Sequence, residues 1–342
     1  MATPTLTRRK VLNTAALVTT ALAAPFVHGA YAAGKLSCGF WDHWVPGANE
    51  PLAKLCREWA DREKVDLTID FITSQGDKLA LTATAEAQAR SGHDILQMSD
   101  WYVAAQADNL EPVDELVTSL IKEHGKLLLG SEYIGRQKGR WIAVPTGLQT
   151  TGQIPCARID HFKKFVGLDV TRMYPAGAPP DEALANAWTW AGFLAAAENC
   201  AKAGYPFGMP LSTWSDSVNW VGAVFAAQGA QLVDGEGNIT VKSDEVKEVL
   251  KWFKKIVPFL PPSVFAWDNA ANNKWLISGQ GALIMNPPGA WAVAVRDAPG
   301  VAEQLWTFHS PKGPKGRFDP CNFGFFGVSG IFPPMQARRR AS

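Results

Sequence analysis

Short catalytic and metal-binding motifs are missing from this 342-residue chain. It has no HExxH motif, no G-x-S-x-G nucleophile elbow and no Walker phosphate loop. The Gly235-x-Gly237 and Gly279-x-Gly281 pairs both lack the third glycine of a dinucleotide site. The six histidines are dispersed along the chain. We therefore expect no metal ion, no cofactor and none of the catalytic residues that these motifs supply.

Cysteine is also scarce, and the spacing of the five residues matches neither CxxC nor a zinc site. Because the count is odd, at least one thiol stays outside any disulfide within the chain or pairs between chains. We favour buried thiols or one structural bridge, without a redox role. The five residues are Cys38, Cys56, Cys156, Cys200 and Cys321.

Neither sign of charge is in excess, with 33 Lys and Arg residues against 32 Asp and Glu residues. Removal of residues 1–32, which hold three basic residues and no acidic one, would change the net charge from +1 to −2. Phosphate binding generally needs a basic face, so we expect no nucleic-acid partner. The near-neutral balance likewise gives no sign of a highly charged ligand.

After residue 32 the chain has no uninterrupted apolar run of membrane-spanning length. Before it, Arg8, Arg9 and Lys10 precede an Ala-rich apolar run, and Ala30-Tyr31-Ala32 forms a small-residue cleavage pattern. The paired arginines favour a twin-arginine signal for export to the periplasm, although Val11 in place of the usual Phe leaves Sec export open. A membrane anchor is the less favoured alternative, because the apolar run is short and a cleavage pattern follows.

The richest stretch is 272–297, NNKWLISGQGALIMNPPGAWAVAVRD. Residues 282–285 are apolar and bounded by Gly and Asn-Pro-Pro, which predicts a central strand covered on both faces. The prolines stop this strand and suit the first turn of a helix over 289–295. Asn286 and Trp291 then lie at the carboxyl edge of a strand, where open α/β sheets bind ligands. For an isolated Trp, packing in a core is the alternative.

The order of an aromatic residue, Gly-x-Gly, apolar strand, small loop and Gly-x-Trp resembles family 1 extracellular solute-binding proteins. These are the maltose-binding-protein-like periplasmic receptors of ABC importers. Further landmarks follow in the family's order from about Lys35 to Phe326. The resemblance implies an α/β fold of two lobes, each a mostly parallel sheet flanked by helices, with a ligand cleft between them. It also implies that Trp291 stacks on a bound sugar.

Two strand-end loops in the first half carry candidate ligand residues. Residues 35–41 read as the first strand, and Asp42 and Trp44 follow it, where the family's first loop touches ligand. For Asp42, capping of the next helix is an equal alternative. Residues 91–98 form a turn and a strand similar to the family's Gly-x-Asp segment. Asp100 and Trp101 at its end would accept hydrogen bonds from sugar hydroxyls and stack on the ring.

In the second half, the resemblance places Thr146 and Gln149 in the cleft, just after a strand that crosses between the lobes over 139–146. Residues 206–211 read as a strand. Asp216, Asn219 and Trp220 follow it as further candidates, with capping or packing as their alternatives. Apolar residues at helical spacing over 246–257 predict an amphipathic scaffold helix that includes Leu250.

We therefore divide the chain into an export signal (1–32), a first lobe (33–144), a second lobe (145–318) and a return crossing toward the first lobe (319–342). Members of the resembled family usually carry further helices, whereas this sequence ends on Arg338-Arg339-Arg340 after Pro333-Pro334. We expect a truncated or frame-shifted carboxyl terminus.

The main hypothesis is a non-catalytic, monomeric periplasmic receptor that closes over a carbohydrate and delivers it to the permease subunits of an ABC importer. A secreted glycoside hydrolase with two of these carboxylates as acid and nucleophile is the competing hypothesis, because acid pairs can lie far apart in sequence. A twin-arginine substrate folded around a redox cofactor is a weaker third. Sugar recovered intact after binding would distinguish the receptor from the hydrolase.

Overall fold

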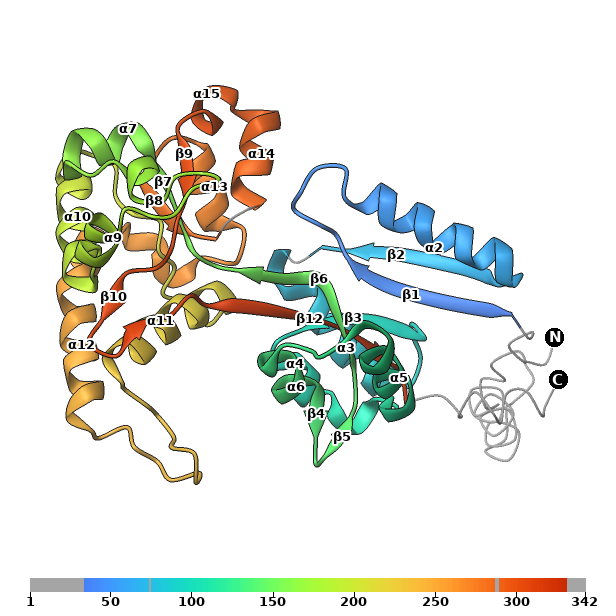
Figure 1. Cartoon of the computed structure of the whole chain (residues 1–342). Coiled ribbons are helices and arrows are strands. Elements are labelled where there is room, and N and C mark those ends of the chain that lie inside the picture. The colour runs from blue at the N-terminus through green and yellow to red at the C-terminus, as the bar shows by residue number, and fades with distance from the viewer. Residues whose placement is uncertain (1–33, 74, 287–288, 331–342) are drawn as a thin grey trace, which may run out of the picture.

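The computed structural model describes residues 34–73, 75–286 and 289–330, so the expected export signal and residues 331–342 lie outside the described part of the chain. Figure 1 shows two lobes joined by two strands, β6 (Val144–Gly152) and β12 (Cys321–Val328), which run side by side between them. They pair in antiparallel fashion, from Phe326 with Val144 to Cys321 with Gly152. The arrangement is the two-lobed α/β fold predicted from the sequence.

The first lobe is built on a five-stranded sheet in the order β2-β1-β3-β12-β6. Strands β1 (Lys35–Trp41), β2 (Asp66–Ile72) and β3 (Ile95–Ser99) pair in parallel, whereas β12 is antiparallel to β3. Apolar residues alternate with polar ones over 65–71, which predicts a strand with one covered face. The structure confirms this, because Leu67, Ile69 and Phe71 of β2 are partly buried and the residues between them are exposed. This lobe is mostly parallel, as predicted.

Helices cover this sheet and build a core around Leu96, Met98 and Phe325. Helical spacing predicts one covered face for α2 (Asn49–Glu63) that includes Leu55, Trp59 and Ala60. In the structure Ala53 and Ala60 are buried, whereas Leu55 and Trp59 are exposed. The small alanines are the residues of α2 that are buried, and the larger Leu55 and Trp59 side chains lie at the surface. The other elements of the lobe are η1 (Gln75–Asp77), α3 (Lys78–Ala89), α4 (Tyr102–Ala105), η2 (Ala107–Asn109), α5 (Asp114–His124), α6 (Leu129–Gly135), β4 (Arg136–Gln137) and β5 (Arg140–Trp141).

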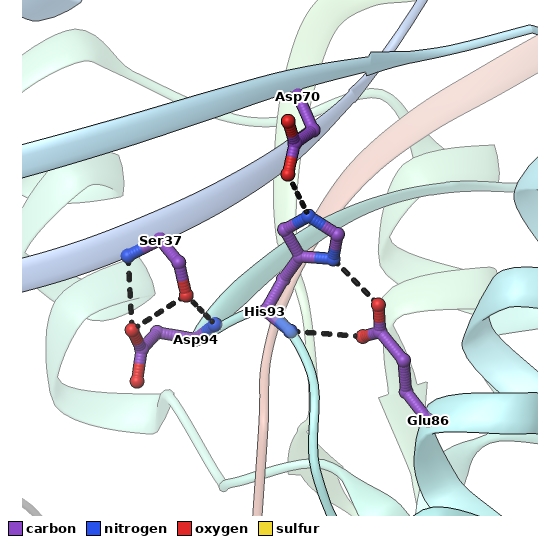
Figure 2. Close-up of polar contacts among 5 residues, drawn as sticks. All are labelled: Ser37, Asp70, Glu86, His93 and Asp94. Carbon is purple, nitrogen blue, oxygen red and sulfur yellow. Dashed lines mark hydrogen bonds and ion pairs between the residues drawn. The ribbon is translucent and has the colours of Figure 1, made fainter.

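A polar cluster fixes the start of β3 against its neighbours (Figure 2). The His93 ring contacts Glu86 of α3 at 2.6 Å through Nδ1 and Asp70 of β2 at 3.0 Å through Nε2. Next to it, the Asp94 carboxylate accepts hydrogen bonds from both the backbone N–H and the hydroxyl of Ser37 in β1. Hydrogen bonding to Glu86 raises the pKa of His93 above its ordinary value. The Gly-x-Asp segment therefore has a structural role here.

The second lobe departs from the mostly parallel sheet that we predicted. Its three-stranded sheet has the order β8-β7-β9, and β7 (Pro155–Arg158) is antiparallel to both β8 (Leu283–Met285) and β9 (Leu305–Thr307). The strand predicted over 206–211 is wrong, since these residues lie outside regular structure and Gly208 makes a backbone hydrogen bond to Leu283. Pro206 and Pro210 have no N–H to donate, which accounts for the missing ladder.

Helices and an aromatic-rich core surround this smaller sheet. From the sequence, Thr189 is expected to cap the helix that follows it. The structure confirms this cap, because the Thr189 hydroxyl accepts a hydrogen bond from the N–H of Gly192. The lobe contains α7 (Ile159–His161), η3 (Phe162–Val166), α8 (Val170–Met173), α9 (Glu182–Ala187), α10 (Trp190–Lys202), α11 (Ser215–Gln228), α12 (Asp244–Ile256), η4 (Val257–Phe259), η5 (Pro262–Ala266), α13 (Ala271–Ile277), α14 (Gly289–Asp297), α15 (Pro299–Ala302), β10 (Lys312–Gly313) and β11 (Gly316–Arg317).

Strand β8 and helix α14 match the strand and the helix predicted over 282–285 and 289–295, and all three strand residues are buried. All five cysteines are free thiols, with Cys38, Cys156 and Cys200 buried, so the chain has buried thiols and no structural disulfide among them.

Within the described ranges, no helix has the length and apolar character needed to cross a membrane. The same residues hold no cluster of His, Cys, Asp or Glu side chains that could bind a metal ion.

Candidate functional site

A groove of about 930 Å3 is lined by both lobes and by the strand that joins them. The first lobe contributes Asp100 and Trp101 from the end of β3, and the second contributes Asn219 from α11. Cys321 and Phe323 of β12 lie between them. The remaining lining residues come from α4, α6 and the β4–β5 hairpin, and they are Ala104, Glu132, Tyr133, Ile134, Arg136, Gln137 and Gly139.

Asp100 is fixed to the joining strand by a pair of hydrogen bonds. Its backbone N–H donates to the carbonyl of Phe323 at 3.0 Å, and its carboxylate accepts from the N–H of Phe323 at 2.9 Å. Its φ of 48° lies in the left-handed region, which Asp tolerates better than most residues. The side chain is buried, and burial raises its pKa to about 6. Asp100 therefore stands at the groove wall in a defined orientation.

On the side of the second lobe, the buried carboxylate of Asp216 collects three side-chain amides. It accepts from Gln153 Nε2 at 2.9 Å, Asn272 Nδ2 at 3.1 Å and Asn286 Nδ2 at 2.9 Å. Because each amide N–H2 faces the carboxylate, each amide oxygen must point away from it. The oxygen of Gln153 does so and accepts from Asn219, at 3.0 Å. Asp216 thus sets the orientation of the amides around it.

Asn219 extends this amide network to the joining strands. Its N–H2 group donates to Gln153, which follows β6, and to the side-chain oxygen of Asn322 in β12. Since Asn219 also lines the groove, the start of α11 connects the groove wall to both crossing segments. These hydrogen bonds therefore connect the second lobe to both segments that join it to the first lobe.

The two buried carboxylates influence one another across the lobes. Burial raises the pKa of Asp216 to about 7, more than the hydrogen bonds from Gln153 and Asn272 lower it. The negative charge of Asp100 raises it further. By contrast, Glu132 and Arg136 in the groove neutralise each other through an ion pair of 2.9 Å. The groove therefore offers hydrogen-bonding groups without a strong excess charge.

A second approach of the lobes lies at the loop after β1. A Cβ added to Gly289, the first residue of α14, would lie 3.5 Å from the Cβ of Trp44. Trp291 follows two residues later and is 49% exposed. Asp42 is exposed, and its carboxylate accepts from the Asn49 side chain at 2.7 Å. The helix-capping alternative for Asp42 is wrong, because α2 begins after Ala48 without a side-chain cap.

The remaining predicted site residues fall in different places. Trp220 is fully buried in the aromatic core, where its indole N–H donates to the carbonyl of Pro210 at 2.6 Å. It cannot stack on a ligand, and the packing alternative holds for it. Thr146 pairs with Gly324 where β6 meets β12. Gln149 belongs to β6, and its side chain lies outside the described part of the chain.

Several polar residues around the site were not predicted from the sequence: Gln153, Asn272, Asn322, Glu132, Tyr133 and Arg136. Asn272 is fully buried, and a polar residue among apolar helix positions is a signal that could have marked it. Tyr133 and Arg136 carry no such signal, because a short polar hairpin and helix are common on any surface.

The sequence model of the bacterial extracellular solute-binding protein family matches residues 60–332, about four fifths of the chain. The chain belongs to this family. Solute-binding proteins bind and release their ligands without catalysis, so the chain is not an enzyme and the glycosidase alternative is set aside. The match includes the first lobe from the end of α2 onward, the second lobe, the joining strands and every residue that lines the groove.

Solved structures of the same architecture are similar to this solute-binding protein along 90% of its length. Maltose-bound MalE3 of T. maritima has a TM-score of 0.65 at 18% identity, with 75% of that chain covered. A solute-binding protein of Thermotoga lettingae bound to alpha-D-tagatose gives 0.71 at 13%, with 76% covered. One of Agrobacterium vitis with bound D-mannitol gives 0.63 at 15%, with 71% covered. No curated protein matches the chain.

Proposed function

We propose that this solute-binding protein captures a neutral sugar or polyol in the groove between its lobes and hands it to an ABC importer. The groove carries this proposal, because both lobes and the joining strand line one space of about 930 Å3. A ligand in it would touch Asp100 and Trp101 on one side and Asn219 on the other. Closure of the lobes would then depend on occupancy, and a permease would recognise the closed form.

The chemistry of the groove favours a ligand rich in hydroxyl groups. Carboxylate and amide groups exchange hydrogen bonds with hydroxyls, and the face of Trp101, which is 40% exposed, suits the C–H face of a sugar ring. The Glu132–Arg136 ion pair leaves no free cation for an anionic ligand among the described residues that line the groove. The similar structures described above hold maltose, tagatose and mannitol, which are all neutral and polyhydroxylated.

The ligand contacts in this proposal are Asn219 of the groove lining and the sequence-based candidates other than Asp216 and Trp220. Asp216 is buried and orients Asn286 without touching the ligand itself. Trp220 is also buried, and it stabilises the core without touching the ligand. The direct contacts proposed are Asp42, Trp44, Asp100, Trp101, Thr146, Gln149, Asn219, Asn286 and Trp291.

We also propose that residues 1–32 direct export to the periplasm, where the protein acts as a monomer. The adjacent Arg8 and Arg9 support the twin-arginine route. A fusion of these residues to a reporter, compared with the same fusion carrying the double substitution Arg8→Lys/Arg9→Lys, tests the route of export. Loss of export in the substituted fusion supports the twin-arginine signal, and unchanged export supports Sec.

The function itself is tested by a thermal-shift screen of sugars and polyols, followed by calorimetric titration of each hit. A ligand that binds the folded form raises the melting temperature by mass action. The ligand is then released and analysed, and it should be recovered unchanged. If charged amino acids or peptides raise the melting temperature and no sugar or polyol does, the proposed ligand class is wrong.

A further inference from the structure

A second surface with unusual composition lies on the second lobe, away from the groove between the lobes. Residues 231–241 project from this lobe between α11 and α12 (Figure 1). A bridge between Val233 and Ile239 and a hydrogen bond from Thr240 to Leu232 hold them as a hairpin. Leu232, Val233 and Ile239 are nonetheless exposed, Ile239 by 78%. An ordered hairpin that presents three large apolar side chains to solvent is a feature of interaction surfaces.

The adjoining face of α12 adds lysines to this apolar surface. Lys247, Leu250, Lys251 and Lys254 are spaced i, i+3, i+4 and i+7, so they lie on one side of the helix. The opposite side packs inward through Val246, Val249 and Ile256. Leu250, which the periodicity placed in the scaffold, is 59% exposed. The helix therefore shows solvent a leucine flanked by cations.

Between the hairpin and the helix lies a groove of about 470 Å3, here called the α12 groove. Its lining residues are Val241, Lys242, Ser243, Lys247, Leu250, Lys251 and Lys254. Every charged side chain in this lining is a lysine. Lys251 pairs with Glu248 at 2.6 Å, and Glu248 is not part of the lining. The groove thus combines an apolar floor with a rim in which lysines predominate.

We propose that the α12 groove docks an acidic amphipathic helix of a partner protein. An apolar side chain of that helix would contact Val241 and Leu250, while carboxylates one turn away on each side would pair with the lysines. Lys247 and Lys254 are seven residues apart, so the rim is about 10 Å long, which corresponds to two turns of a partner helix. An apolar side chain between cations spaced over two turns matches the side-chain pattern of an amphipathic helix.

Charge decides the class of partner. Lys251 is paired with Glu248, but Lys242, Lys247 and Lys254 attract an acidic segment over several ångströms and repel a basic one, which gives both faster association and selectivity. None of the residues lining the α12 groove lines the groove between the lobes. Docking of the partner and binding of the small ligand therefore use separate surfaces, and each can fail without the other.

The test uses a fluorescein-labelled, capped synthetic helix with Glu at i, i+4 and i+7 and Leu at i+3 on an Ala/Gln background. Two comparison peptides carry the same residues in scrambled order or Lys in place of Glu. Fluorescence anisotropy is measured during titration with the full chain. The first peptide should bind saturably and the other two at least about tenfold more weakly, with affinity falling as salt is raised.

Matched variants of the chain locate the binding surface. The double substitution Lys247→Glu/Lys254→Glu should weaken binding of the acidic peptide at least about tenfold. Leu250→Ser should weaken it while leaving its salt dependence, since the lysines remain. The control Lys122→Glu/Lys126→Glu reverses two exposed lysines at the end of α5 and should leave binding unchanged. Circular dichroism melting confirms that each variant is folded.

Three results would overturn the proposal: no saturable binding of the acidic helix, equal binding of the scrambled peptide, or unchanged binding by Lys247→Glu/Lys254→Glu. Vesicles containing phosphatidylglycerol provide a further comparison. Vesicle binding that depends on Lys247 and Lys254, without peptide binding, would assign the surface to a membrane and also refute a protein partner.

Discussion

The side-chain amide of Asn286 donates a hydrogen bond of 2.9 Å to the carboxylate of Asp216, although 70 residues separate them in sequence. Asn286 follows β8 directly and Asp216 lies in the first turn of α11, so the contact joins the sheet of the second lobe to the helix that reaches the groove. Because the amide nitrogen is committed to Asp216, the amide oxygen of Asn286 is the atom left to accept a hydrogen bond from a ligand hydroxyl. The buried carboxylate of Asp216 thereby fixes the direction of the Asn286 amide oxygen.

Ligand affinity should depend on the protonation of Asp216. The ionised carboxylate accepts from all three amides, whereas a protonated one has an O–H that competes with an amide donor. Since the pKa of Asp216 is raised to about 7, affinity should fall about fivefold between about pH 8 and about pH 6. Titration calorimetry across this range measures it. Asp216→Asn should bind more weakly and without this pH dependence, and a retained dependence would contradict the role of Asp216.

The same raised pKa has the opposite effect on stability. Folding favours the protonated form of Asp216, so its contribution to stability is fully present below about pH 4 and is lost as the pH rises through about 7. Without ligand, the melting temperature of the native chain should therefore decrease more steeply over this range than that of Asp216→Asn. Melting curves at several pH values give the two slopes. Parallel slopes would show that the carboxylate is not held against ionisation.

Tryptophans at different depths should respond differently to removal. Trp101→Ala should weaken ligand binding by about 1 kcal/mol, or about fivefold, with little loss of stability. Trp220→Ala should instead lower the free energy of unfolding by about 3–5 kcal/mol, because the indole is fully buried. Trp59→Ala is the matched control, since Trp59 is exposed by 40% like Trp101 but lies on α2. Equal binding by Trp101→Ala and Trp59→Ala would remove Trp101 from the site.

The His93 cluster should give a pH-dependent term in stability that does not involve the site. Folding raises the pKa of His93, so its contribution to stability is fully present below about pH 6.5. This contribution is lost as the pH rises through the pKa that His93 has in the folded chain. His93→Gln should cost about 1–2 kcal/mol at about pH 5.5 and less at about pH 8.5. Denaturant unfolding at both pH values measures the difference. An equal cost of His93→Gln at both pH values would contradict this role of the charged imidazole.

Much of the fold was predictable because local chemistry and packing agree. The buried run over 282–285 and the alternation in β2 predicted their strands, and the spacing of apolar residues predicted α12. The antiparallel second sheet was not predictable, because the pairing of β7 with β8 and β9 joins segments more than a hundred residues apart. Prolines in 206–211 also mimic strand boundaries while removing the donors that a strand needs.

For the site, residue type predicted which loops face the groove, but it did not predict which side chains are exposed and which are buried in the core. Asp100 and Trp101 line the groove, as expected for a polar and aromatic pair that follows a buried strand. Trp220 was chosen on the same kind of pattern, yet helical phase turns it into the core. The buried amides around Asp216 were missed because the sequence does not show that side chains far apart in the chain donate hydrogen bonds to the same carboxylate.

The most direct test of the central claim is calorimetric titration of the best sugar or polyol from the thermal-shift screen into the native chain and into Asp100→Asn/Trp101→Ala. Binding with one ligand per chain, weakened at least about tenfold in the double variant and unchanged in Trp59→Ala, is the predicted result. Binding of equal strength in all three proteins would place the ligand outside the groove between the lobes and contradict the account.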